Sequence, residues 1–463
     1  MPRPPRITRE LLTSLIRSRG PVSATELADL LRANRSTITR ALSGWGDELV
    51  TLGATRSTRY LLRRSVRGIG GCWPIYRIDE AGRAHQWAEL EALHDRNWRM
   101  KWHGEAPAWS QLFTEENGLW QGFPFFLEDI RPQGFLGRII AGGIARTLRV
   151  PEDPRQWSDE DNLTHLQEMG DDLPGNVVIG DACLRRALAR SPMLTRENAI
   201  HPESREAIYP AQALGITQSL PGSSAGGEQP KFLATLRLED GLRPVIVKFS
   251  APVDQPTGRR WSDLLVAELV AHQTLAETGL AGTGAELIHA DGRSFLEIAR
   301  FDRTAGGGRR GLVSLQALLA ATGNLHLRDW PAAAETLQRL RLIDEDSVRT
   351  IRLLHAFGEL IGNSDMHAGN LSFFMGNSLP FRLAPAYDML PMLWAPGPQG
   401  EIVPRRFAPA PPLPSLLPIW REAAVLAERF WERLSDDGRL SAEFSGEARS
   451  ARATLHHLRK HVG

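Results

Sequence analysis

Hydrophobic and polar positions follow a helical period at the start of the chain and a strand period shortly afterwards. Leucine and isoleucine residues three and four positions apart indicate a first helix, which Gly20-Pro21 ends. Ser23 and Glu26 have the capping-box spacing that begins a second helix. The pattern therefore predicts helices over residues 8–18, 23–31 and 35–45, followed by a β-hairpin over residues 49–64.

The pattern is less regular from residue 68 onward. Weak alternation over residues 73–78 predicts strands, and we interpret the aromatic residues of segment 118–140 as core. The acidic segment 152–173 is expected to be a loop. The proline-rich segment 395–418 is expected to be a surface loop.

Charge changes this picture more than overall composition does. The chain has 463 residues with 42% hydrophobic and 24% charged, as in ordinary globular proteins, and its net charge is +1. Residues 1–67 contain 13 arginines, no lysine and 5 acidic residues, a net charge of +8 that leaves −7 for the remainder. A basic module on an acidic body indicates a polyanion-binding head, and a solvated basic face is the alternative.

Length and apolar content bound the class of protein. The length predicts two or three domains. No stretch approaches the roughly 20 apolar residues of a membrane span, and the first residues lack the apolar run of a signal peptide. We therefore expect a cytoplasmic protein with no membrane partner. Cys72 and Cys183 have no CxxC spacing, which favours two buried thiols over one disulfide.

Helix, helix, helix and hairpin, with a short turn before the third helix, resembles the winged helix-turn-helix modules of bacterial DNA-binding proteins. The resemblance implies that the third helix enters the major groove and that hairpin arginines contact the DNA backbone. A small helical domain that binds another protein is the alternative. The candidate DNA-binding residues are Arg35, Ser36, Thr37, Thr39, Arg40, Arg56 and Arg59.

Two lysines, Lys231 and Lys248, lie where they could bind phosphate groups. A Ser/Gly cluster over residues 221–228 precedes Lys231, and glycines let backbone N–H groups approach phosphate oxygens closely. The spacing is not that of a Walker A loop. Lys248 lies in a Val/Ile run that predicts a buried strand, where an ammonium is costly unless it meets an anion. A strand-end lysine whose stem reaches water is the alternative.

Glu268 lies in an apolar helical run that follows Lys248. It is a candidate for the ion pair that orients the lysine in kinases, and an exposed position on an amphipathic helix is the alternative. Segment 296–307 reads as a strand that leads into a glycine-rich turn. In a two-lobed kinase this is the place where a hinge presents backbone groups to adenine.

The strongest chemical pattern lies in residues 358–374 and 381–390. Asp365 and Asn370 have the D-x-x-x-x-N spacing of the protein-kinase catalytic loop, and Asp388 follows another apolar run. Phosphoryl transfer needs an aspartate that accepts the proton of the attacking hydroxyl, and oxygen ligands for Mg²⁺. Helix capping by these residues is the structural alternative. A zinc hydrolase is disfavoured, because paired ligands such as HExxH do not occur.

These segments together resemble the HipA-like serine/threonine kinases, the toxin halves of bacterial toxin–antitoxin pairs. The resemblance covers roughly residues 70–440 through GSSAGGEQPKF, VIVKF, ARFDR, NSDMHAGNLSFF and PAYDML. With the N-terminal module in front, the chain is similar to the YjjJ-type subgroup. The implied α+β fold has a winged helix-turn-helix over residues 1–67, a HipA-like N-terminal subdomain over 68–178, a kinase N-lobe core over 179–300 and a mainly helical C-lobe over 301–463.

The resemblance also implies roles for individual residues. Asp365 corresponds to the catalytic base, with His367 and Asn370 in the same loop, while Asn370 and Asp388 correspond to the Mg²⁺ ligands. The implied ATP-binding residues are Ala225, Gly226, Gly227, Lys231, Lys248, Ala299, Arg300, Phe301, His367, Asn370, Tyr387 and Asp388. The resemblance also implies autophosphorylation at Ser223 or Ser224, since a serine of this loop is autophosphorylated in several family members. Phosphate there would repel the phosphates of ATP and inhibit ATP binding.

The resulting expectation is an ATP- and Mg²⁺-dependent serine/threonine kinase that phosphorylates a cellular protein, by analogy one of the translation machinery. DNA binding would couple this activity to transcriptional autoregulation. A separate antitoxin and a homodimer stay open as partners. Two other functions also stay open. One is a small-molecule phosphotransferase, because the segment DMHAGN resembles the catalytic loop of such enzymes. The other is a transcription regulator with a nucleotide-sensing, kinase-like body.

Overall fold

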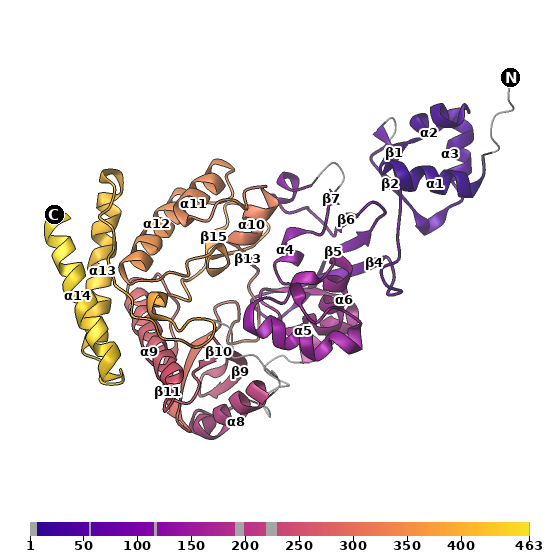
Figure 1. Ribbon diagram of the computed structural model, residues 1–463. Coiled ribbons are helices and arrows are strands. Elements are labelled where there is room, and N and C mark those ends of the chain that lie inside the picture. Colours follow the sequence, from indigo (N-terminus) through magenta and orange to yellow (C-terminus); the bar gives the residue numbers. More distant parts are fainter. Residues whose placement is uncertain (1–6, 55–56, 115–117, 190–198, 219–228, 463) are drawn as a thin grey trace.

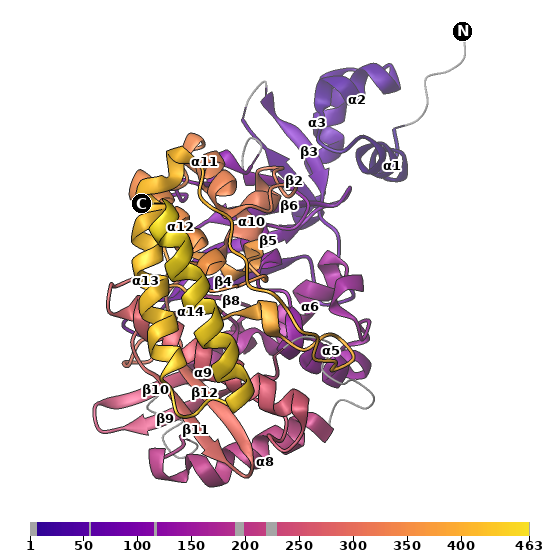
Figure 2. The same cartoon turned by 60° about the vertical axis from the view of Figure 1, so that its left-hand side comes forward.

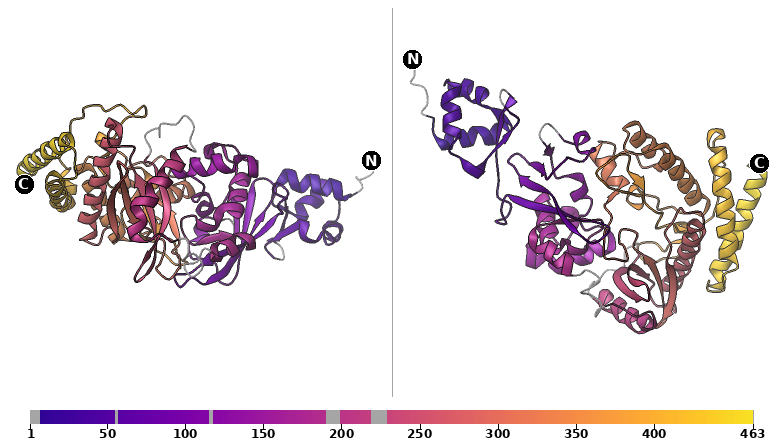
Figure 3. Two further views of the ribbon diagram at one scale, coloured as in Figure 1. Left: turned by 90° about the horizontal axis from the view of Figure 1, so that it is seen from below. Right: turned by 180° about the vertical axis from the view of Figure 1, so that it is seen from behind.

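The computed structural model describes residues 7–54, 57–114, 118–189, 199–218 and 229–462 (Figure 1). A small N-terminal module lies at one end of the molecule, and the last two helices lie at the other (Figures 1 and 3). Within these ranges the chain forms four separate sheets with helices around them.

The N-terminal module contains three helices and a three-stranded antiparallel sheet of order β1-β3-β2. Its elements are α1 (Arg9–Arg19), β1 (Val22–Ser23), α2 (Ala24–Leu31), α3 (Arg35–Leu42), β2 (Leu49–Leu52) and β3 (Arg59–Leu62). The predicted helices and hairpin are present, and the short strand β1 was not predicted. Ser23 caps α2, since its Oγ accepts from Glu26 N at 3.1 Å and Glu26 Oε2 accepts from Ser23 N at 2.6 Å.

The N-terminal module packs directly on the following sheet. Val50, Leu52 and Leu61 of the hairpin are buried against Leu93 and Leu119. Three arginines that follow the hairpin add ion pairs to the same body. These pairs are Arg63 with Glu91, Arg64 with Glu160 and Arg67 with Asp161. Apolar burial and ion pairs together therefore set the orientation of the module.

A five-stranded antiparallel sheet of order β7-β6-β5-β4-β8 follows, with helices against it (Figure 1). Its elements are β4 (Cys72–Ile78), β5 (Ala84–Ala92), β6 (Asn97–Trp102), β7 (Leu119–Gln121), α4 (Phe125–Glu128), α5 (Gly134–Leu148), α6 (Asp159–Met169), β8 (Val177–Ile179) and α7 (Asp181–Ala189). The ring centroid of buried Trp109 lies 5.7 Å from that of Phe125 and 5.6 Å from that of Phe126. Both phenylalanines are buried, which confirms their interpretation as core.

Two predictions for this region were wrong. The acidic segment 152–173 contains helix α6, because Ser158 and Asp161 form a capping box and Leu163 and Leu166 are buried. Acidic residues in a first turn also favour the helix dipole, so acidity did not indicate a loop. Cys183 is buried as expected, but Cys72 is exposed, since it alternates with the inward-facing Trp73 on β4; both thiols are free.

A second antiparallel sheet has the order β11-β12-β10-β9. Its strands are β9 (Lys231–Leu238), β10 (Gly241–Phe249), β11 (Ala285–Ala290) and β12 (Arg293–Ala299). Two helices of the same region are α8 (Arg205–Gln218) and α9 (Pro256–Ala276). Tyr209 of α8 packs with Phe232 and Phe295 of the sheet. Leu265 and Leu269 of α9 pack with Leu296 in a separate cluster. The sheet is thereby held between two helices.

The C-terminal part is mainly helical, as expected (Figure 2). Its elements are β13 (Leu312–Ser314), α10 (Leu315–Ala321), α11 (Trp330–Arg339), α12 (Glu345–Leu360), β14 (Ser372–Phe374), β15 (Arg382–Leu383), α13 (Leu417–Ser435) and α14 (Ala442–Val462). The three strands form a small antiparallel sheet, and α13 packs against α12, α14 and α9. Across the described ranges, every helix is too short or too polar to cross a membrane.

Candidate phosphoryl-transfer site

Lys248 lies on β10, one residue before the end of that strand. Its register partners are Lys231 on β9 and Leu296 on β12. The side chain is almost wholly buried, with 7% exposed. A buried ammonium needs nearby anions, and the structure supplies two of them from different elements.

Glu268 of α9 and Asp388 of the loop after β15 both bind the Lys248 ammonium. Glu268 Oε1 lies 2.5 Å from Lys248 Nζ, and Asp388 Oδ1 accepts a hydrogen bond from the same nitrogen. Glu268 is therefore a buried partner of the lysine, not an exposed residue of an amphipathic helix. With both carboxylates ionised the three groups carry a net charge of −1, which favours binding of a further cation.

The two carboxyl groups respond differently to this environment. Burial alone would raise the pKa of Asp388, but the charges of Lys248 and Lys231 and the hydrogen bond from Lys248 together outweigh burial and lower that pKa to about 2. Burial raises the pKa of Glu268 and outweighs the same lysine. For Lys248, burial acts to lower the pKa, and the two carboxylates outweigh it and raise the pKa above its ordinary value. Asp388 is therefore the carboxylate that stays ionised most firmly.

The loop between α12 and β14 has its shape fixed by hydrogen bonds to the backbone of Asp365. The carbonyl of Asp365 accepts from His367 N at 3.0 Å and from Asn370 Nδ2 at 2.9 Å. Its N–H donates to Asn363 Oδ1 at 3.0 Å. The residue itself is exposed. Trp330 Nε1 donates to His367 O at 3.1 Å and holds the loop against α11.

Asn363 links this loop to Asp388 and was missed by the sequence reasoning. It is buried, and its Nδ2 donates to the carbonyl of Asp388 at 3.3 Å while its Oδ1 binds Asp365 N. The Asp-to-Asn spacing drew attention to Asp365 and Asn370, and Asn363 lies only two residues before that pattern. A polar residue directly after Gly362 at the end of an apolar helix was the available signal.

Asp388 and Asn370 have the donor chemistry of a magnesium site. The amide nitrogen of Asn370 is engaged with Asp365 O, which leaves its carbonyl oxygen available as a ligand. Asp388 has a positive φ of 54°, a conformation that aspartate tolerates better than most residues and that often occurs at functional sites. Mg²⁺ prefers such oxygen ligands and commonly takes only one or two from the protein, so these residues fit it.

The predicted adenine segment is only partly free to bind a ligand. The N–H groups of Ala299 and Arg300 donate to Gly284 O at 2.9 Å and Pro244 O at 3.0 Å. The side chain of Arg300 is buried and binds Asp302. These groups are already engaged within the fold. Phe301 lies beside Tyr387, with ring centroids 5.7 Å apart.

Arg300 belongs to a buried ionic network that joins this segment to the five-stranded sheet region. Asp302 binds both Arg300 and Arg303, and each arginine also binds Asp172, close after α6. No pattern along the chain indicated this network, because Asp172 lies 128 and 131 positions before Arg300 and Arg303. It holds the segment after β12 rigidly against the preceding region.

Part of the predicted site cannot be placed. Ser223, Ser224, Ala225, Gly226, Gly227 and Arg56 lie outside the described residues. Lys231 is described, and its charge contributes to the low pKa of Asp388 after that of Lys248. Lys231, Lys248, Asp388 and the Asp365 loop are thus brought together from four separate segments.

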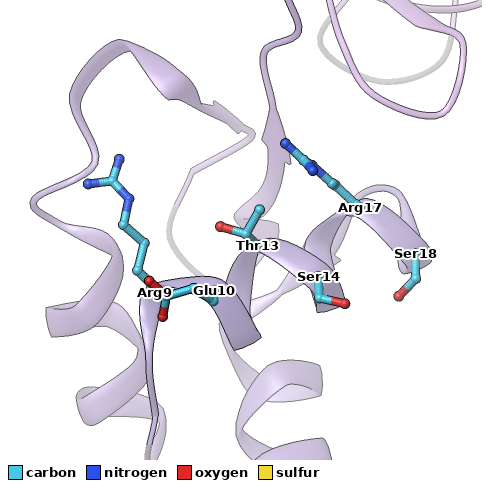
Figure 4. Close-up of a pocket in the computed structure, with 6 residues that line it drawn as sticks. All are labelled: Arg9, Glu10, Thr13, Ser14, Arg17 and Ser18. Carbon is cyan, nitrogen blue, oxygen red and sulfur yellow. The ribbon is translucent and has the colours of Figure 1, made fainter.

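The predicted DNA-binding residues of α3 share one exposed surface. Arg35, Ser36, Thr37, Thr39 and Arg40 are all exposed. Arg59 is engaged within the module, since its Nη1 donates to Pro21 O at 2.9 Å. A shallow surface hollow also lies along α1 (Figure 4) and is lined by Arg9, Glu10, Thr13, Ser14, Arg17 and Ser18. This hollow belongs to the N-terminal module and not to the Lys248 site.

Known protein families and solved structures match most of the chain. A family model described as HipA-like C-terminal domain matches residues 223–429, and one described as YjjJ-like toxin, middle domain, matches residues 69–188. A chain of the Shewanella oneidensis MR-1 complex of HipA, HipB and operator DNA has a TM-score of 0.51 and 14% identity, covering 83% of this chain and 96% of its own. The proinflammatory kinase CtkA of Helicobacter pylori has a TM-score of 0.35 and 15% identity, covering 50% and 92%.

The fold is therefore that of a HipA-type, kinase-like protein. Toxin YjjJ of Escherichia coli (strain K12) is 35% identical over 443 residues, which cover 94% of each chain. The chain belongs to the YjjJ-like toxin family.

Proposed function

We propose that this protein is an ATP- and Mg²⁺-dependent serine/threonine protein kinase of the HipA toxin type, with a DNA-binding module at its N-terminus. The observation that carries the proposal is the cluster in which Lys248 binds Glu268 and Asp388 while Asn363 ties Asp388 to the Asp365 loop. A lysine–glutamate pair, a metal-binding aspartate and an aspartate–asparagine loop are the parts that kinases use for phosphoryl transfer.

Each residue has a role in this proposal. Lys248, oriented by Glu268, binds the phosphates of ATP, and Lys231 adds positive charge beside it. The Asp365 carboxylate hydrogen-bonds the substrate hydroxyl and accepts its proton as the oxygen attacks the γ-phosphorus and the bond to ADP breaks. Asn370 holds the backbone of Asp365 through its amide nitrogen, so the carboxylate is positioned before substrate arrives.

Asn370 Oδ1 and the Asp388 carboxylate are the proposed ligands for Mg²⁺. When bound, the metal neutralises charge on the phosphate oxygens. The low pKa of Asp388 keeps that carboxylate ionised throughout the neutral range, as a metal ligand requires. Ser223 or Ser224 is the proposed site of autophosphorylation, and a cellular protein is the proposed substrate.

The test is to incubate the purified protein with γ-labelled ATP, with Mg²⁺ or with excess EDTA, and to locate the label by mass spectrometry. We expect magnesium-dependent phosphate on Ser223 or Ser224, because the carboxylates need a cation before the triphosphate can approach them. ATP binding without any label on protein, under conditions in which a lysate metabolite is labelled, would contradict the proposal and favour a small-molecule phosphotransferase. Binding with no label anywhere would favour a nucleotide sensor.

For DNA binding, the proposal rests on the N-terminal module alone. Its elements follow the order helix, strand, helix, helix, strand, strand, which is that of a winged helix-turn-helix, and the outer face of α3 carries Arg35 and Arg40. Arg17 on α1 adds a further cation to the module. The HipA relative was solved with HipB and operator DNA, whereas here the proposed DNA-binding module is part of the same chain.

Arg35→Gln/Arg40→Gln is expected to weaken binding to double-stranded DNA and to reduce the salt dependence of that binding. Two lost phosphate contacts should lower the slope of log K against log salt by about 2. Arg185→Gln/Arg341→Gln removes the same charge from exposed positions elsewhere and serves as the control. Fluorescence anisotropy with a labelled duplex measures both. Equal slopes for the two double variants would remove α3 from the proposed interface.

A further inference from the structure

The segment from Glu401 to Leu413, here called the strap, crosses the surface without regular secondary structure and leads towards α13. It contains the prolines Pro404, Pro409, Pro411 and Pro412. Figure 2 shows it as a long extended trace on the near side of the molecule, and in Figure 3 (left) it lies at the edge of the molecule. Proline restricts φ, so the strap is pre-organised in an extended conformation.

A single buried side chain anchors the strap beside the proposed catalytic loop. Phe407 packs on Trp394 and Trp431, with ring centroids 6.0 and 5.5 Å apart. A Cβ placed on Gly362 would lie 3.5 Å from the Phe407 ring. Because Gly362 lies only three residues before Asp365, Phe407 holds the middle of the strap close to the loop that carries the proposed base.

The strap presents unused polar groups next to this anchor. Arg405 and Arg406 are exposed, and neither forms an ion pair or side-chain hydrogen bond with any described residue. Residues 402–412 are all described, and their backbone forms no hydrogen bond in the structure. By contrast, Arg260, Arg300 and Arg303 have almost wholly buried side chains and are paired with acidic residues.

We propose that the strap binds an acidic, extended segment of the protein substrate and so directs a neighbouring hydroxyl to Asp365. Arg405 and Arg406 pair with the carboxylates, while the strap carbonyls and the N–H groups of its non-proline residues hydrogen-bond the backbone of the extended peptide. The exposed Leu413, with 67% of its surface accessible, contacts an apolar residue of the same peptide. This inference rests on the proposed kinase function and adds the substrate class.

A protein ligand fits these features better than a nucleic acid does. Single-stranded nucleic acids are bound through aromatic side chains on which the bases stack, as well as through cations. The one aromatic residue of the strap, Phe407, is buried against Trp394 and Trp431 and is unavailable for stacking. Backbone groups in an extended conformation match the repeat of another extended peptide.

The experiment uses the full-length protein and two fluorescein-labelled 12-residue peptides. One contains a serine flanked by six glutamates, and the other has glutamine in place of each glutamate. Anisotropy is expected to show tighter binding of the acidic peptide, and Arg405→Gln/Arg406→Gln should weaken it about 5- to 30-fold, as for the loss of two partly screened ion pairs. Arg185→Gln/Arg341→Gln, which leaves the strap intact, should change it less than about 2-fold.

Autophosphorylation from γ-labelled ATP is measured in the same variants. Arg405→Gln/Arg406→Gln should retain it, because the strap is proposed to bind the substrate and not ATP; loss of autophosphorylation in this variant would overturn the inference. Equal affinity for the two peptides, or equal weakening by the two double variants, would also overturn it. The inference would also be overturned if a labelled 12-nucleotide RNA bound more tightly than the acidic peptide and this binding depended on Arg405 and Arg406. Arginine-dependent peptide binding without label on any protein would uphold the strap as a peptide site and defeat the kinase proposal alone.

Discussion

Replacing Asp365 with asparagine is expected to lower phosphate incorporation by about 100- to 10,000-fold, the usual contribution of a positioned general base. The asparagine amide keeps the size of the side chain but cannot accept the proton of the attacking hydroxyl. Incorporation is measured with γ-labelled ATP and Mg²⁺, both on the protein itself and on added substrate.

We expect this substitution to leave the loop intact, because several hydrogen bonds of the loop use the backbone of Asp365. The position of Asp365 is held by hydrogen bonds of its backbone to Asn363, His367 and Asn370, and none of these uses the carboxylate. The variant should therefore bind nucleotide and unfold like the wild type. Asp291→Asn, at an exposed turn between β11 and β12, is the matched control and should keep full activity. Near-normal phosphate incorporation by Asp365→Asn would exclude Asp365 as the base.

Replacing Lys248 with methionine is expected to affect both activity and stability. Loss of the phosphate-binding charge should reduce phosphate incorporation about 100- to 1,000-fold, as for other single groups that stabilise transition-state charge. The change also leaves Glu268, with 2% of its side chain exposed, as a buried carboxyl without its cation. Breaking a buried pair in this way costs about 3–5 kcal/mol, measurable as a lower midpoint in urea.

A second substitution separates the two effects. Lys248→Met/Glu268→Gln removes the charge of the more deeply buried of the two carboxylates left without the lysine, so it should recover part of the lost stability while phosphate incorporation stays low. If stability and phosphate incorporation both recovered in this double variant, Lys248 would be needed for the stability of the fold and not for phosphoryl transfer. Glu268→Gln alone should reduce incorporation less than Lys248→Met does, because Asp388 still binds the lysine.

The stability difference between the wild type and Lys248→Met should also depend on pH. The pKa of Asp388 is lower in the folded protein than in the unfolded chain, so its pairing with Lys248 contributes stability that is present above the unfolded pKa of about 4. That contribution is lost as the pH falls from about 4 towards the folded pKa of about 2. The two urea midpoints should therefore approach each other below about pH 4, and a constant difference across this range would contradict the pairing.

Local patterns in the sequence were sufficient for the elements that are stabilised by near neighbours. The helices and hairpin of the N-terminal module followed from helical spacing, from Gly20-Pro21 and from the capping box of Ser23 and Glu26. The strand that carries Lys248 followed from its Val/Ile run. Helix α6 was missed because its start depends on a cap and its apolar face has only a few residues, which burial against other elements completes.

Side-chain partners that are distant in sequence were the part that patterns could not reveal. From the sequence, Glu268 could equally be the partner of Lys248 or an exposed residue of an amphipathic helix. The packing of α9 against the sheet buries Glu268 and so selects the first interpretation. The ionic network of Arg300, Asp302 and Asp172 and the contact of Phe407 with Gly362 depend on chain segments that meet only in the folded protein. No periodicity or spacing encodes these contacts, since each partner lies in a different element.

Residue types and their spacing were enough to predict the kinds of chemistry in this protein: a basic helical module, a strand lysine, and an aspartate–asparagine loop with a later aspartate. These follow from residue type and spacing along the chain, which local backbone geometry converts directly into helices, strands and loops. The folded protein was needed to see that Lys248 is shared between Glu268 and Asp388, that Asn363 joins Asp388 to the Asp365 loop, and that the strap lies beside that loop. The physical reason is that burial and ion pairing are properties of surfaces brought together by folding, and a linear pattern does not specify which surfaces meet.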